Sequence, residues 1–444
     1  MNGFDLSTVT NIYLGSTPVT EVYMGTKLIW SKTIDYSSEY LTIESLEDNN
    51  QIGIINEYKP SISISTDKRT WKTVTPDATP TYFITLNVGE KVYIKGSNDT
   101  YSNNYGDHGY FTSTGKFNVS GNIMSLIHAD DFKNKTTLSS NVSAFVYLFR
   151  NANKLISAEH LVLPATTLSY ECYRSMFEGC SSLTTAPALP ATTLDYGCYS
   201  YMFEGCSSLT TAPELPATTL TEYCYQYMFE GCSSLTTAPE LPATTLANAC
   251  YSYMFQYCSS LTTAPELPAY NLAEYCYQYM FQYCSSLTTA PELPAWELYR
   301  ECYAHMFEGC SLTTAPMLIT TALSYNCYDS MFASCTSLTE APYLPATDLY
   351  PECYAHMFEG CSSLTTAPEL PATYLQNSCY SYMFQDCSSL NYIKIFATDI
   401  SATDCLTGWV TNVASYGTFV KDASTDIPFG YDGIPDGWTV ETVH

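Results

Sequence analysis

The residues of this chain that could carry out chemistry are its cysteines and its carboxylates. Nineteen Cys could ligate metals or form disulfides, and 44 Asp and Glu could bind cations or work as acid–base pairs. The six His are scattered, and the sequence has no HExxH, G-x-S-x-G, P-loop or G-x-G-x-x-G motif. We therefore expect no catalytic residues, no enzyme activity and no cofactor.

The cysteines follow a period. A first series of ten runs from Cys172 and Cys198 to Cys405 in steps of 26 residues, with one step of 25 between Cys302 and Cys327. A second cysteine follows each of the first nine by eight residues, so 10 + 9 = 19 and every cysteine belongs to the repeat. The cysteines therefore report an architecture built from repeats.

Neither disulfides nor zinc fit this spacing. If the eight-residue step between paired cysteines is helical, the two cysteines lie about 12 Å apart, beyond the roughly 7 Å limit of a disulfide. A C-x7-C spacing is not that of a zinc site. We expect no metal site and predict that the cysteines are small, buried apolar residues in stacked ladders.

Each repeat combines two patterns. Cys224, Met228 and Cys232 recur at i, i+4 and i+8, which predicts one apolar stripe of a short helix. The segment from Leu235 to Leu241 is then extended, because Pro239 cannot continue a helix. Since one unit cannot bury its stripe alone, we predict an α/β leucine-rich-repeat solenoid of about nine 26-residue repeats, preceded by an all-β N-terminal hairpin and a small β-sandwich.

The repeat resembles the BspA-type (Treponema-type) leucine-rich repeat over roughly residues 143 to 408. Met228-Phe229, Cys232 and Leu235 occupy the places of that family's Ala-Phe pair, following Cys and strand Leu. Units of 26 residues and Ala-Pro in the strand depart from the family pattern. The resemblance implies a non-catalytic binding surface of the kind found on bacterial adhesins.

The charge is concentrated on the repeats. The net charge is 17 − 44 = −27, and residues 175–393 hold 20 acids but one base, Arg300. This balance excludes nucleic acid as a partner and favours neutral or cationic ones. One column of acids offers weak Ca²⁺ candidates, while Ala188, Met317 and Tyr343 interrupt it. These candidates are Glu214, Glu240, Glu266 and Glu292.

A second column is aromatic or imidazole. It supplies the ligand-binding candidates, because a surface row of Tyr is a rigid contact strip suited to sugars or proteins. The alternative is that these rings lie half-buried between units. The candidates are Tyr201, Tyr227, Tyr253, Tyr279, His305, His356 and Tyr382.

The N-terminal third lacks cysteine, and its alternating runs predict β-structure. Two echoing segments, Ile12–Ser16 and Val22–Thr26, predict a hairpin, and six alternating runs between Tyr40 and Ile127 predict an antiparallel sandwich. The expected domains are an attachment hairpin (1–35), a β-sandwich (36–128), a linker with a degenerate capping repeat (129–171), the solenoid (172–404) and a C-terminal cap (405–444).

The start of the chain resembles N-terminal modules of phage virion and prophage fibre proteins. The order of the regions, a sandwich followed by the repeats and then by the closing segment Gly433–Val440, is similar to that of proteins of gut Bacteroidales and their phages. This implies a phage fibre or decoration protein that contacts other virion proteins through its N-terminal segment and forms a homo-oligomer, typically a trimer. Its solenoid would bind a host-surface glycan or protein.

The expected location is the virion, after synthesis in the host cytoplasm, because residues 1–15 lack a signal-peptide pattern and no stretch of about 20 apolar residues exists for membrane insertion. The alternative is a BspA-like adhesin on the bacterial cell surface. A glycan-degrading enzyme is a third hypothesis, which would need paired carboxylates in a groove.

Overall fold

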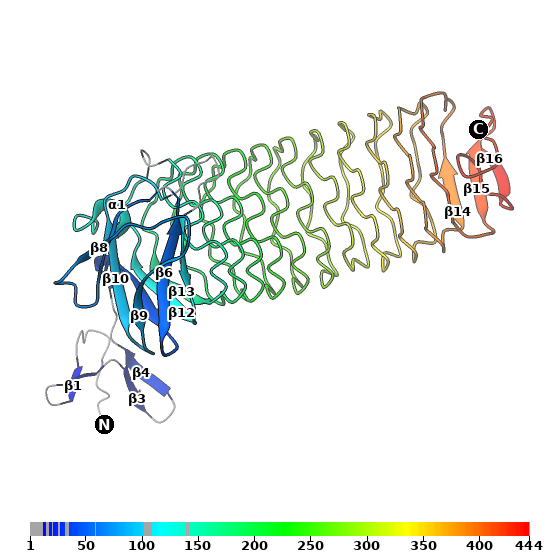
Figure 1. Ribbon diagram of the computed structural model, residues 1–444. Helices are drawn as coiled ribbons and strands as arrows, with labels where there is room; N and C mark the ends of the chain where they lie inside the picture. Colours follow the sequence, from blue (N-terminus) through cyan, green and yellow to red (C-terminus); the bar gives the residue numbers. More distant parts are fainter. Residues whose placement is uncertain are drawn as a thin grey trace, which may run out of the picture.

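A stack of coils forms most of the molecule (Figure 1). The computed structural model describes residues 12–14, 17–19, 21–24, 27–31, 35–57, 59–101, 109–138, 140 and 142–443. The coils run from a β-rich N-terminal region to three C-terminal strands, so the solenoid is closed at both ends by β-structure.

The two similar N-terminal segments form two small hairpins rather than the single hairpin that the sequence predicts. β1 (Ile12–Leu14) pairs antiparallel with β2 (Thr17–Val19), and β3 (Glu21–Met24) pairs antiparallel with β4 (Lys27–Ser31). The segment expected to be the connecting turn thus contains a strand. Each echoed segment begins its own hairpin.

The next region holds two sheets, and each of the six predicted runs forms a strand. One sheet has the order β13-β12-β5-β10-β7-β8 and the other β11-β6-β9. Buried residues of both, among them Ile43 and Ile54, belong to one core. The strands are β5 (Leu41–Ser45), β6 (Asn50–Asn56), β7 (Ile62–Ser65), β8 (Lys72–Val74), β9 (Thr81–Leu86), β10 (Lys91–Gly96), β11 (Gly109–Ser113), β12 (Phe117–Asn122) and β13 (Leu155–Val162). A 3-10 turn, η1 (Tyr36–Ser38), precedes them.

The sandwich continues directly into the first coil. β12 pairs in parallel with β13, which extends the sheet onto the extended side of the coils. On the other side the Phe111 amide donates to the Leu148 carbonyl, and the rings of Phe111 and Phe149 stack at 5.6 Å. Both sheets therefore cover the open end of the stack, where a solenoid needs a cap.

The predicted helix of each repeat is wrong. Among the described residues α1 (Ser125–His128) is the one α-helix, and the Cys-Tyr-x-x-Met-Phe segments are successive turns. Every fourth residue there adopts a left-handed backbone, with φ of +58° at Tyr223, +57° at Tyr227 and +69° at Gly231. A chain that turns every four residues gives the same i, i+4, i+8 stripe as a helix, so periodicity alone could not distinguish them.

The hydrogen bonds of these turns alternate. The amides of Gln226 and Met228 donate to carbonyls three residues back, at 3.2 Å. The amides of Tyr225 and Tyr227 donate to the next coil, at 3.1 and 3.0 Å. Half of the amides therefore join neighbouring coils, whereas an α-helix would direct them all within its own segment. We refer to this part of each coil as the turn side.

The extended side is joined more sparsely. In the middle coils it forms isolated parallel bridges, such as Thr237 with Thr263 and Thr245 with Asn271, in place of the predicted strands. Pro239 and Pro242 lie between these bridges and lack an amide hydrogen, so a continuous ladder cannot form.

Stacked side chains fill the interior. Cys224, Met228, Phe229 and Leu235 are fully buried, and the same positions are buried in the neighbouring coils. The rings of Phe203 and Phe229 stack at 5.6 Å with planes 4° apart. The repeats thus build one continuous core.

The C-terminal end closes the stack. β14 (Tyr392–Ile395) pairs in parallel with β15 (Thr418–Asp422), which pairs in parallel with β16 (Thr439–Val443). Trp409 takes the buried place of the repeat Met and donates from Nε1 to the Gly433 carbonyl at 2.9 Å. Asp432 accepts the Gly408 amide, which in other coils would bond to a following coil.

Candidate functional site

The Tyr and His candidates lie on the turn side and stack face to face. Tyr201, Tyr227, Tyr253, Tyr279 and His305 form one continuous pile, with ring centroids 4.2 to 4.6 Å apart. His356 and Tyr382 form a separate pair at 4.9 Å, because Ser330 interrupts the column between the two groups.

All seven candidates are half-buried. Within the pile each inner ring has a neighbouring ring on both faces, which leaves ring edges and polar atoms for solvent. Burial raises the pKa of Tyr201 and of Tyr253 above the ordinary range. The column therefore offers a polar edge with hydroxyl groups rather than open aromatic faces.

A column of Glu and Gln runs beside the rings. Gln256 donates to Gln282, whose Nε2 donates to Oε2 of Glu308 at 2.7 Å. Nδ1 of His305 also lies 2.7 Å from that Oε2. Sequence reasoning did not single out this column, although its members occupy one fixed position of the repeat.

The surroundings set the proton affinity of these carboxylates. Burial, with the neighbouring Glu178, raises the pKa of Glu204 to about 6. Burial and Glu204 raise the pKa of Glu230 to about 7. Burial alone would raise the pKa of Glu308, but hydrogen bonds from His305 and Gln282 outweigh it and lower that pKa.

His356 is paired in a similar way. Its Nδ1 lies 2.6 Å from Oε2 of Glu359, and this hydrogen bond raises the pKa of His356. Among the candidates, this imidazole therefore gains a proton more readily than a free one.

The cysteines serve the core, as predicted. All 19 are unpaired and buried. Those of the second series donate from Sγ to a Phe carbonyl of the preceding coil, as Cys232 does to Phe203 at 3.2 Å. Burial raises the pKa of Cys224 to about 12, so this thiol stays protonated near neutral pH and is a poor nucleophile.

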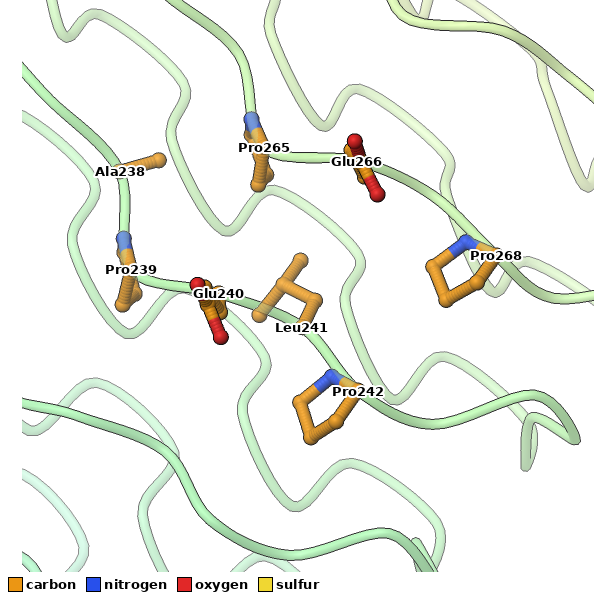
Figure 2. Close-up of a pocket in the computed structure, with 8 residues that line it drawn as sticks. All are labelled: Ala238, Pro239, Glu240, Leu241, Pro242, Pro265, Glu266 and Pro268. Carbon is orange, nitrogen blue, oxygen red and sulfur yellow. The ribbon is translucent and has the colours of Figure 1, made fainter.

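The extended side carries the Glu column. Glu214, Glu240, Glu266 and Glu292 are exposed and alternate with prolines. Figure 2 shows Glu240 and Glu266 in adjacent coils between paired prolines. These carboxylates and prolines line a cavity of about 360 Å³. Similar cavities follow along the same side of the stack. Within the described residues no three His, Cys, Asp or Glu are grouped so as to hold a metal ion.

The types of residue exposed on the extended side change near the 25-residue repeat. Exposed apolar side chains replace the Thr, Glu and Pro of other coils. We call this set the apolar patch: Tyr270, Trp296, Met317, Ile319 and Tyr343. The sequence showed Met317 and Tyr343 as interruptions of the Glu column, and comparing the neighbouring Pro and Thr columns would have added the other three.

The comparisons with known proteins identify the repeats. The family described as BspA type leucine rich repeat region matches in six copies, over residues 146–288, 198–339 and 300–404. These ranges cover more than half of the 444 residues, so the chain belongs to the BspA-type leucine-rich-repeat family, as its resemblance indicated. No curated protein and no solved structure matches the chain.

The α/β fold class predicted for the solenoid is corrected by the structure. The coils consist of turns and extended segments joined by isolated bridges, and α1 is the one α-helix among the described residues. The described chain contains no helix with the length and apolar character needed to span a membrane.

Proposed function

We propose that this chain is a non-enzymatic, adhesin-type surface protein whose solenoid binds a host-surface glycan or protein. The observation that carries this proposal is the BspA-type repeat stack, which presents a long outer surface over a uniform buried core. The near absence of bases between residues 175 and 393 favours neutral or cationic ligands.

The stacked Tyr column is the first contact surface to test. A variant with Tyr227→Ala, Tyr253→Ala and Tyr279→Ala should lose attachment of the labelled chain to intact host cells or envelope extract. Circular dichroism and thermal unfolding would establish that the solenoid remains folded. Unchanged attachment by a folded variant would exclude this column as the contact.

A more specific question is whether the solenoid is displayed on a phage particle or on a bacterial cell. The N-terminal resemblance favours a phage fibre or decoration protein, with residues 1–35 contacting other virion proteins and the chain forming a trimer. The repeat family itself favours the alternative, a bacterial cell-surface adhesin. Mass spectrometry that found the chain in a cell-surface fraction and not in purified phage particles would eliminate the virion assignment.

A non-enzymatic role is supported by the chemistry of the buried groups. The thiols are buried, and the described carboxylates with raised pKa values, Glu204, Glu230 and Asp329, all lie among the stacked rings of the turn side. Incubating the purified chain with host-surface glycans should leave their lengths unchanged. Measurable cleavage would contradict the proposal.

A further inference from the structure

We infer that the apolar patch is a docking surface for a protein segment that combines apolar and cationic side chains. This inference rests on the proposed binding function and names the kind of partner. It adds a second contact surface, on the extended side, to the Tyr column of the turn side.

The bridges between coils fix the register of the patch. Thr289 pairs with Thr314, and Thr314 pairs with Glu340. Three residues beyond these bridges, Glu292, Met317 and Tyr343 therefore occupy one column in consecutive coils.

The remaining patch residues lie in the adjoining columns. Glu297 pairs with Ala322, which aligns Ile319 with Pro294 of the preceding coil. Trp296 follows Pro294 by two residues, and its ring centroid lies 6.3 Å from that of Tyr270. The five side chains thus occupy neighbouring positions across four coils.

The patch is exposed to an unusual degree for apolar side chains. The exposed fractions are 74% for Met317, 66% for Trp296 and 64% for Tyr343, with 51% for Tyr270 and 50% for Ile319. Apart from Ala188, the regular coils hold Glu, Pro or Thr at these positions and stack in the same way, so the architecture does not require apolar residues here. A grouped apolar surface with a polar surround is characteristic of interaction sites.

The residue types and the charge select the partner. Trp, Tyr and Met are enriched in protein interfaces, and Met317 and Ile319 offer no hydrogen-bonding group to a glycan hydroxyl. The surrounding carboxylates of Glu292, Glu297 and Glu340 complement Lys or Arg. A second copy of the same surface would bring like charges together, which disfavours pairing of two patches.

The chain supplies its own matched variants. A consensus variant gives each patch position the residue of a regular coil: Tyr270→Thr, Trp296→Thr, Met317→Glu, Ile319→Pro and Tyr343→Glu. Its two added carboxylates would strengthen the attraction to a cationic partner. If binding is nevertheless lost, the loss must come from the missing apolar contacts. A graft onto the consensus variant rebuilds the patch three coils earlier: Thr192→Tyr, Thr218→Trp, Glu240→Met, Pro242→Ile and Glu266→Tyr. Thr219→Glu and Thr263→Glu supply the flanking carboxylates that join Glu214 there.

The test is selection of a random short-peptide display library on the full chain, with counter-selection on the consensus variant. We expect enriched peptides to combine apolar residues with Lys or Arg. A synthetic enriched peptide should bind the consensus variant about tenfold or more weakly and should regain affinity for the graft. A charge variant with Glu292→Gln, Glu297→Gln and Glu340→Gln should bind it more weakly and with less dependence on salt.

Several results would overturn the inference. These are no enrichment, enrichment of acidic peptides, or equal peptide affinity for the chain and a folded consensus variant. Binding of neutral polysaccharides that the consensus variant loses would assign the patch to glycans, and a dimer that disappears in this variant would assign it to self-association. If the consensus variant still attaches to host cells like the unaltered chain, the adhesin function stands and this inference fails.

Discussion

The turn side and the extended side of each coil meet their neighbours in different ways. On the turn side, amides such as those of Tyr225 and Phe229 donate to carbonyls of the next coil. Buried rings of neighbouring coils, such as Phe229 and Phe255, also stack on one another there. On the extended side, prolines interrupt the contacts to isolated bridges, and side chains such as Glu240 face solvent. The turn side therefore holds the stack together, while the extended side is free to change its residues.

This difference explains where the repeats vary. The 25-residue unit keeps Cys302, Met306 and Phe307 buried, although it has lost a Ser and carries Met317 and Ile319 in place of Glu and Pro. A deletion and two apolar replacements are accommodated because few hydrogen bonds between coils depend on them. Surface residues can thus change on the extended side without disturbing the core.

The largest effect that we predict is on the turn-side core. Phe229→Ala should lower the free energy of unfolding by about 3–5 kcal/mol, because it leaves a cavity between two stacked rings. Pro242→Ala on the extended side should change it by less than about 1 kcal/mol. Chemical denaturation of both variants measures the contrast, and equal losses would remove the distinction between the two sides.

The second effect concerns the left-handed turn at Gly231. A Cβ there meets the backbone of Gly205 at an ordinary 3.6 Å, so the backbone angle rather than crowding sets the cost. Gly231→Val should destabilise by about 1–2 kcal/mol, since φ is +69°. Gly231→Tyr should cost less, because Tyr257 and Tyr283 occupy this position in other coils with φ near +60°. A Val variant as stable as the original would argue against the turn geometry.

A smaller effect is expected from pH. The pKa of Glu204 is raised to about 6 and that of Glu230 to about 7 in the folded chain, above an ordinary value of 4.5. The folded state therefore binds more protons than the unfolded state between about pH 4.5 and 7, and this contribution to stability falls as pH rises through that window. Glu230→Gln should reduce the slope and stabilise the chain at pH 8, as measured by thermal unfolding. An unchanged slope would show that Glu230 is solvated.

The smallest effect concerns a buried hydroxyl. The Tyr225 hydroxyl is buried and has no hydrogen-bond partner in the described chain. Tyr225→Phe should therefore leave stability unchanged or raise it by up to about 1 kcal/mol. A clear loss of stability, seen in the same denaturation assay, would show that this hydroxyl is bonded inside the core.

The repeat arithmetic predicted the stack and its buried cysteines because identical residues recur wherever a coil must meet the next one. It could not predict the turn backbone, since Cys224, Met228 and Cys232 align equally in a helix and in turns of four residues. Gly231 carried a signal for the left-handed turns, but Tyr at the same position of other coils obscured it.

The candidate site was predicted in part. The Tyr column was identifiable as a repeat position, yet the mutual stacking of its rings depends on the spacing between coils, which one repeat does not reveal. The apolar patch joins residues of four coils. It becomes visible once Trp296, Met317 and Ile319 are placed in adjacent columns.

The most direct test of the division between the two sides is amide hydrogen exchange of the full chain, read by residue. The account predicts strong protection of the Tyr225, Tyr227 and Phe229 amides, which bond to the next coil. It predicts fast exchange of the Glu240 and Leu241 amides, which have no backbone acceptor within the described chain. Equal protection on both sides, or greater protection of the extended side, would contradict it.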